Sequence, residues 1–199
     1  RMGQAFHAFS AAVNRDIKRI TSTLDEMHVI NMGATAIGTA INAKPQYFDH
    51  ITGKLSELFG ERLERANDLF DGTQNVDGFA SVSGALKACA INLSKLCNDL
   101  RLMSSGPRTG LGEIILPAKQ NGSSIMPGKV NPVIPEVVNQ TAFLVIGHDV
   151  TITMAAEAGQ LELNAFEPVI FYQLFESIRA LTGAINTLIV NCIEGITVN

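Results

Sequence analysis

The run from Gly122 to Pro132, Gly-Ser-Ser-Ile-Met-Pro-Gly-Lys-Val-Asn-Pro, gathers groups that can bind an anion. It holds two serine hydroxyls, the ammonium of Lys129 and the amide of Asn131, and it contains no carboxylate. Pro127 and Gly128 disfavour a helix, and glycine also tolerates positive φ. Backbone N–H groups in such a stretch can turn toward a negative charge. The run therefore predicts an anion-binding active-site loop.

This run also has a bland structural reading and a nucleotide-binding one. The serines could be ordinary turn residues, Lys129 a solvated surface charge and Asn131-Pro132 a helix-capping turn. A phosphate-binding loop is excluded, because five residues separate Gly122 from Gly128 and Val130 replaces the hydroxyl residue that would bind magnesium. No strand is expected before the run, which also argues against nucleotide binding.

The composition limits the partners that the chain can have. It has 199 residues and 46% of them are apolar, which is enough for a sizeable core. Charged residues make up only 17%, which is low for a monomer and predicts that surface is buried against other copies. A net charge of −4 gives no reason to expect nucleic acid or an anionic membrane as partner. With no signal peptide and no long apolar run, we expect a soluble, cytoplasmic protein.

The cysteines are odd in number and widely spaced, at Cys89, Cys97 and Cys192. No CxxC motif or Cys/His cluster is present, so neither a disulfide framework nor a zinc site is predicted. We expect each thiol to fill space in the core. The four histidines show no metal-ligand spacing, and the sequence predicts no metal and no cofactor.

Apolar periodicity indicates the elements that must position the loop. Apolar residues recur every three or four positions over 6–27, 79–103 and 174–192, the spacing of long helices in a bundle. A fourth long helix is expected from just after Pro135 to about Gly159, although its β-branched residues would also suit a buried strand. A short helix is expected around Asp49–Phe59, ending at Gly60. These elements predict an all-α fold, a long-helix bundle.

Three stretches rich in glycine or proline are expected to connect these helices: 33–46, 71–78 and 106–135. The last is long enough to indicate a function beyond linkage.

The loop motif also carries a resemblance to a known family. Gly-Ser-Ser-x-Met-Pro-x-Lys-x-Asn-Pro is similar to the signature of the aspartase/fumarase superfamily, whose members release fumarate from their substrates. Residues 135–140 and 154–161 resemble the aspartate ammonia-lyases within it, whereas class II fumarases differ at both places. Residues 33–39 and 105–111 also fit the superfamily, so the resemblance covers nearly the whole chain.

The resemblance implies roles for five residues. Ser123 would be the general base that removes a proton beside a carboxylate, which requires strong stabilisation of its alkoxide. Ser124, Lys129 and Asn131 would bind a carboxylate of a small dicarboxylate substrate. Glu136 matches a glutamate that pairs with a histidine in fumarases, and we expect it to be catalytic with Ser123. Arg108 could contact an anion or brace the loop.

The resemblance also implies how the chain fits into a larger protein. Residues 1–199 would form the central helical-bundle domain, without the N- and C-terminal domains of the superfamily, and four copies would assemble into a homotetramer. Three subunits contribute different motifs to each active site, and this segment carries only the third. We therefore expect the segment alone to be inactive.

Several alternatives stay open beside the aspartate ammonia-lyase reading. A class II fumarate hydratase shares the loop motif. Argininosuccinate and adenylosuccinate lyases fit less well, because their sequences differ after the lysine of the motif. From another class, the isolated chain could be a non-catalytic helical oligomerisation core.

Overall fold

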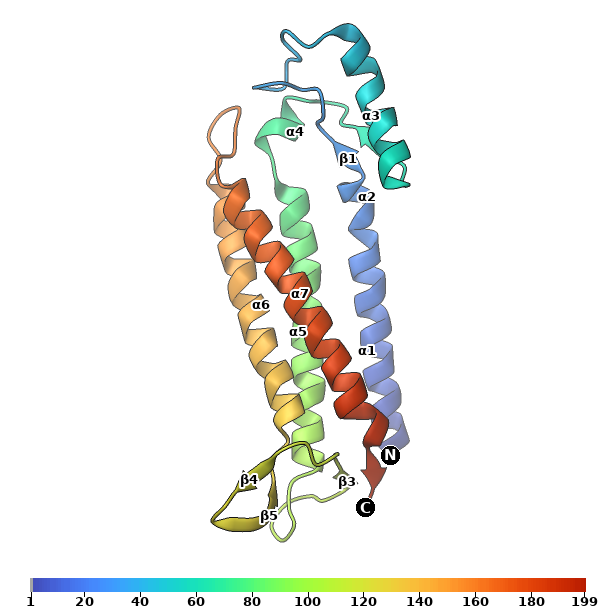
Figure 1. Ribbon diagram of the computed structural model, residues 1–199, viewed down its shortest axis with the longest axis vertical. Helices are drawn as coiled ribbons and strands as arrows, with labels where there is room; N and C mark the ends of the chain where they lie inside the picture. Colours follow the sequence, from blue (N-terminus) through green and yellow to red (C-terminus); the bar gives the residue numbers. More distant parts are fainter. Residues whose placement is uncertain (1) are drawn as a thin grey trace. The chain divides into compact units, whose positions relative to one another are not determined.

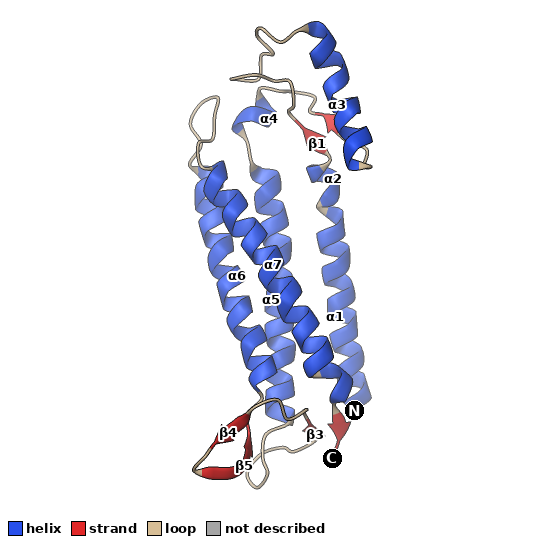
Figure 2. Cartoon of the chain, in the orientation of Figure 1, coloured by secondary structure: helices blue, strands red, loops and turns tan. Residues whose placement is uncertain are grey.

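A computed structural model describes residues 2–199, in which four long helices predominate (Figure 1). They are α1 (Met2–Ser22), α5 (Asp77–Met103), α6 (Val133–Glu157) and α7 (Glu167–Asn191). Strands are short and few in the described residues (Figure 2). The predicted all-α class and the four long helices are confirmed.

The remaining elements are short, apart from one helix of middle length. They are α2 (Leu24–Met27), β1 (Val29–Ile30), α3 (Pro45–Phe59), β2 (Glu64–Arg65), α4 (Asp71–Gln74), β3 (Ile114–Ile115), β4 (Asn121–Ser123), β5 (Met126–Val130), the 3₁₀ turn η1 (Ile193–Gly195) and β6 (Thr197–Val198). β1 pairs with β2 in parallel, whereas β3–β6 and β4–β5 are antiparallel.

The chain divides into two compact units, and the long helices contribute to both. The first unit contains the residues up to Asp16 together with Leu86–Gly147 and Phe175–Asn199. The second contains Ile17–Ala85 and His148–Leu174. The whole Gly122–Pro132 run belongs to the first unit.

Helical spacing of apolar residues builds the core of the first unit. Its buried side chains include Leu93, Leu96, Cys97 and Leu100 from α5, Val138, Ala142 and Val145 from α6, and Leu181, Ala184 and Leu188 from α7. These positions recur every three or four residues, so each helix presents one apolar stripe. The valines of α6 lie on a helix, and the alternative of a buried strand there is wrong.

In the second unit, the turn between α6 and α7 is held by Asn164. The buried Asn164 side chain donates from Nδ2 to the carbonyls of Ala155 and Ala156, at 3.0 and 3.1 Å. Its Oδ1 accepts a hydrogen bond from the N–H of Phe166 at 2.8 Å. One amide therefore satisfies backbone groups at the end of α6 and at the start of α7. Nearby, Phe79 and Phe171 pack edge to face at 4.9 Å between ring centroids.

Helix boundaries differ from the predictions at several places, and one of them is the start of α6, which begins at Val133 and not after Pro135. α1 stops at Ser22, where the Thr23 hydroxyl donates to the carbonyl of Ile20 at 2.7 Å and competes with helix continuation. α3 begins earlier than expected, at Pro45, because proline needs no N–H partner at the first helical position. Its predicted end is confirmed, since Gly60 adopts φ 73° and caps the helix. α7 begins at Glu167, seven residues before Leu174, where the apolar repeat of this helix starts.

The expected connections also contain structure. The 71–78 stretch includes α4 and the first two residues of α5, and the 106–135 stretch includes β3, β4 and β5. Strands this short give no alternation that could be read from the sequence.

Candidate functional site

The predicted loop folds as a β-hairpin in the first unit. β4 and β5 pair antiparallel, with Asn121 opposite Val130 and Ser123 opposite Met126. Ser124 and Ile125 make the turn, and the Ser123 Oγ accepts a hydrogen bond from the N–H of Ile125 at 3.2 Å. This contact points one backbone donor at the hydroxyl oxygen, the polarity that stabilises a developing alkoxide.

The hairpin brings Gly122 against Lys129. A Cβ added to Gly122 would lie 2.6 Å from Cγ and 2.8 Å from Cδ of Lys129, closer than packed atoms allow. Glycine at this position therefore leaves room for the aliphatic part of the lysine, which an added Cβ would displace. Lys129 is exposed, so the ammonium can reach an anion from solvent.

The five predicted site residues follow each other closely along this part of the chain. Ser123, Ser124 and Lys129 belong to the hairpin, Asn131 directly follows β5, and Glu136 lies in the first turn of α6. Ser123, Asn131 and Glu136 are half-buried, whereas Ser124 is exposed. Within residues 2–199, these five side chains make no hydrogen bond to one another. Arg108 is also exposed.

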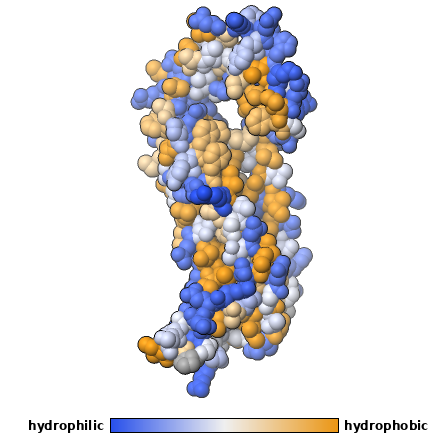
Figure 3. All heavy atoms as spheres, viewed as in Figure 1, coloured by the Kyte–Doolittle hydropathy of each residue, from blue (hydrophilic) through white to orange (hydrophobic). Residues whose placement is uncertain are grey.

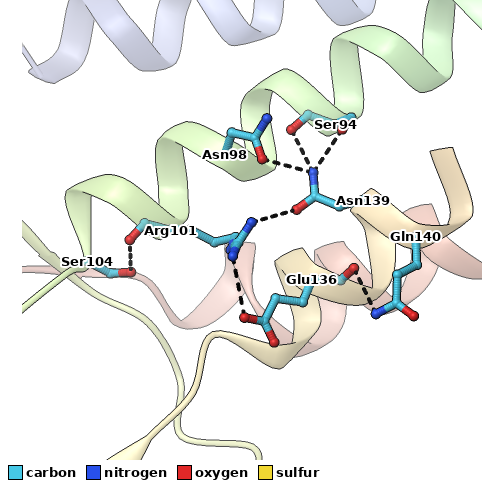
Figure 4. A network of polar contacts seen from close by, with 7 residues as sticks. All are labelled: Ser94, Asn98, Arg101, Ser104, Glu136, Asn139 and Gln140. Atoms are coloured by element: carbon cyan, nitrogen blue, oxygen red, sulfur yellow. Dashed lines mark hydrogen bonds and ion pairs between the residues drawn. The ribbon is translucent and has the colours of Figure 1, made fainter. Parts of the chain in front are cut away.

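Glu136 is tied to a residue that the sequence analysis did not single out. Its Oε1 lies 3.6 Å from Nη2 of Arg101, near the end of α5. The Nη1 of the same guanidinium donates to Oδ1 of Asn139 at 3.4 Å. Figure 4 shows Arg101 reaching both α6 residues at once.

Asn139 is in turn fixed to α5. Its side-chain amide is buried and donates to the carbonyl of Ser94 at 3.0 Å, to the Ser94 hydroxyl at 2.8 Å and to Oδ1 of Asn98 at 3.1 Å. Because all these partners are acceptors, they fix the amide nitrogen toward α5 and leave its oxygen facing Arg101.

A signal for this network was present in the sequence. Ser94, Asn98 and Arg101 follow each other at spacings of four and three, and Glu136 and Asn139 are three apart. Residues at these spacings share one helix face, so polar side chains on an otherwise apolar stripe indicate partners on a facing helix.

The three cysteines are buried and form no disulfide, as predicted for small core residues. The pKa of Cys97 is raised to about 12, mainly by burial; Cys192 acts in the same direction and Arg101 in the opposite one. Burial also raises the pKa of Cys192. Both thiols are therefore protonated at neutral pH and chemically inert.

Two further properties bear on the kind of site. Among the described residues, His, Cys, Asp and Glu side chains form no group of three or more that could hold a metal ion. No helix within residues 2–199 combines the length and the apolar character needed to span a membrane.

Known proteins that resemble the chain include several bacterial enzymes. A protein-family model described as "Lyase" matches residues 1–147. The chain is 54% identical over 198 residues to an aspartate ammonia-lyase from Bacillus sp, 54% to one from Helicobacter pylori strain 26695, and 52% to one from Escherichia coli K12. It is covered completely in each case but spans only 41–42% of the relative.

Solved structures agree with this similarity. A fumarate lyase:delta crystallin from Brucella melitensis matches with a TM-score of 0.96 at 50% identity, covering 99% of this chain and 43% of that one. A class II fumarase from Schistosoma mansoni also gives a TM-score of 0.96, at 30% identity, with 99% and 44% covered.

Proposed function

This chain belongs to the lyase family whose model matches residues 1–147, and we propose that its whole protein eliminates ammonia from L-aspartate to give fumarate. The observation that carries the proposal is 54% identity to aspartate ammonia-lyases along the whole chain, with an intact Gly122–Pro132 motif. The segment spans about two fifths of those relatives, so the activity is proposed for the full-length protein.

The reaction needs a base at the carbon beside one carboxylate. We assign this role to Ser123: its Oγ takes the proton from Cβ, and the electron pair of the C–H bond moves into the adjacent carboxylate. The pair then forms the C=C bond of fumarate while the C–N bond breaks and its electrons leave with nitrogen as ammonia. The Ile125 N–H that reaches Ser123 Oγ supports this role, because a donor there favours the alkoxide.

The carboxylate that gains charge needs donors and a cation. We assign these to Ser124, Lys129 and Asn131, which the hairpin and its exit carry. Lys129 supplies the charge, and its exposure on the hairpin suits a ligand that arrives from solvent. We assign Glu136 a supporting catalytic role at the start of α6.

A fumarate hydratase is the second candidate. The 30% identity and TM-score of 0.96 to the Schistosoma mansoni fumarase favour it. The chain superposes on that fumarase as well as it does on the fumarate lyase:delta crystallin from Brucella melitensis. Such an enzyme would remove water from malate through the same proton abstraction.

We also propose that the full-length protein is a homotetramer assembled through these helices, with the active site completed by other subunits. Large apolar side chains of α6 and α7 remain exposed although the first unit has formed its core. Phe143 on α6 and Phe175 on α7 are examples, each 63% exposed. Orange apolar atoms lie on the surface that Figure 3 presents. Exposed apolar area of this kind favours an interface. The competing reading, a non-catalytic oligomerisation core, applies to the isolated segment.

Three buried cysteines that form no disulfide fit a reducing compartment, so we place the enzyme in the cytoplasm.

The test is fumarate formation, followed by ultraviolet absorbance, with aspartate and malate offered separately to the full-length protein and to the 1–199 segment. We expect the full-length protein to act on aspartate and the segment to be silent. Turnover of malate alone would assign the protein to the fumarases. An active segment would contradict the need for motifs from outside it. Light scattering after size-exclusion chromatography measures assembly, and a full-length monomer at micromolar concentration would contradict the tetramer.

A further inference from the structure

The Glu136–Arg101 ion pair joins two helix ends within the first unit. Arg101 lies in the last turn of α5, and Glu136 lies in the first turn of α6. The α5 end carries a partial negative charge that favours a cation, and the α6 start carries a partial positive charge that favours an anion. Each side chain is therefore well placed on its own helix before the two meet.

Arg101 contacts only one of the two carboxylate oxygens of Glu136. The contact reaches Oε1 at 3.6 Å, and the other oxygen points away from the guanidinium in Figure 4. A carboxylate held in this way keeps one oxygen available for a further partner.

Arg101 has a second contact on α6 that orients it. The buried Asn139 amide presents its oxygen to Nη1, and that amide is held by Asn98 and Ser94, which lie one and two turns before Arg101 on α5. Because the guanidinium is planar, fixing Nη1 also fixes the direction of Nη2 toward Glu136. The buried Asn139 side chain therefore orients Arg101, and Arg101 in turn orients the half-exposed carboxylate of Glu136.

Stability does not account for this arrangement. The side chains of Arg101 and Glu136 are 42% and 37% exposed, and ion pairs in such surroundings add little to the free energy of folding. The buried Asn139 contacts already fasten α5 to α6 without the charges.

From this geometry we propose that Arg101 is a positioning residue for Glu136, directed by Asn139, and that it acts on turnover only through that carboxylate. The inference rests on the catalytic role proposed for Glu136 in the lyase reaction. It adds a residue outside the Gly122–Pro132 motif to the machinery of the site.

The test is a double-mutant cycle in the full-length enzyme with aspartate. Arg101→Met should lower kcat by about 10–100-fold, the range expected when a catalytic group is misplaced. KM should change by less than about 3-fold, because binding groups are untouched. Arg101→Lys keeps the charge but cannot contact Glu136 and Asn139 together, so it should restore kcat only in part. Glu136→Gln combined with Arg101→Met should be as slow as Glu136→Gln alone.

Lys95→Met is the matched control. Lys95 also lies on α5 and forms an exposed ion pair, with Asp99, but it has no link to Glu136. It should leave kcat and KM at wild-type values.

The outcomes separate this inference from the proposed function. A full-length protein that forms no fumarate from aspartate or malate overturns the function. In an active enzyme, the positioning role is overturned if Arg101→Met keeps its kcat or if the two losses multiply. A harmless Glu136→Gln overturns it together with the catalytic role of Glu136, while the lyase activity itself stands. If Arg101→Met does not fold, Arg101→Lys takes its place in the cycle. The double variant with Glu136→Gln should then again be as slow as Glu136→Gln alone.

Discussion

Asn92 on α5 donates from Nδ2 to both carboxylate oxygens of Asp16 on α1, at 2.8 and 2.9 Å. Asp16 is 2% exposed, whereas Val13 and Ile17 beside it on α1 are 36% and 56% exposed. The polar residue of this helix turn is therefore the buried one, and the apolar seam predicted for this helix lies largely outside the core of the chain. The carboxylate depends on partners of this kind, because an unpaired buried charge is costly.

Asn92→Leu in the full-length protein should lower stability by about 1–3 kcal/mol, because it removes two donors from a buried carboxylate. The thermal midpoint measures the loss. Asn14→Leu, at an exposed α1 position, is the control and should change little. Replacing Asp16 and Asn92 together by leucine should recover part of the loss, since the buried charge is then absent. A double variant less stable than Asn92→Leu would argue against this explanation.

Ser123→Ala should reduce kcat about 10²–10⁴-fold, because it removes the proposed base. Light scattering should show the same assembly as wild type. Ser22→Ala, which removes an exposed hydroxyl bonded to the Arg19 carbonyl, serves as control. Turnover near wild type in Ser123→Ala would take the base role away from this serine.

Lys129→Ala should act mainly on binding, because its ammonium is assigned to a substrate carboxylate. We expect KM for aspartate to rise by about 10-fold or more, the scale of one lost charged contact. Steady-state kinetics separate KM from kcat. An unchanged KM would contradict the assignment.

Gly122→Ala should resemble Lys129→Ala, although it removes no functional group. The added Cβ would lie 2.6 Å from Lys129 Cγ, so the lysine stem must leave its place. KM should rise while the assembly is unchanged. Gly53→Ala in α3, where nothing lies within 4 Å, should leave the kinetics unchanged. A wild-type KM for aspartate in Gly122→Ala would show that substrate binding does not depend on the position of the Lys129 side chain.

Cys97 should resist alkylation in the folded protein. With its pKa raised to about 12, only about one molecule in ten thousand carries the thiolate at pH 8. Mass spectrometry after iodoacetamide should find Cys97 unlabelled when folded and labelled in denaturant. Because the folded thiol holds its proton more tightly, its contribution to stability is present below the unfolded pKa and is lost as pH rises from about 9 toward 12. Rapid labelling of the folded protein would contradict the burial of this thiol.

The long helices were predictable because their apolar residues recur at helical spacing; α5, α6 and α7 bury that stripe, whereas α1 leaves most of it outside the core. Gly60 marks a helix end by a property of glycine alone. The boundaries were harder, because they depend on local hydrogen bonds. Thr23 ends α1 with its hydroxyl, which the apolar repeat through Met27 does not reveal. Most strands were missed because two or three residues carry no periodicity, and the five residues of β5 include Pro127 and Gly128, which are uncommon inside strands.

The site residues could be selected from the motif, but not their surroundings. Pairing Ser123 with Met126 requires a register that glycines and prolines leave open. Arg101 and Glu136 are 35 positions apart in the sequence, and only the packing of α5 on α6 brings them together. Long-range polar contacts of this kind depend on tertiary structure, so composition and spacing alone did not identify them.

The contacts of Asn164 have a consequence for the order of folding. Its hydrogen bonds span nine, eight and two positions of sequence, whereas the Asn92–Asp16 bonds span 76. Closing a short loop costs less chain entropy than closing a long one. We therefore expect the α6–α7 hairpin to form early, from contacts that need no other part of the chain, and α1 to join α5 afterwards.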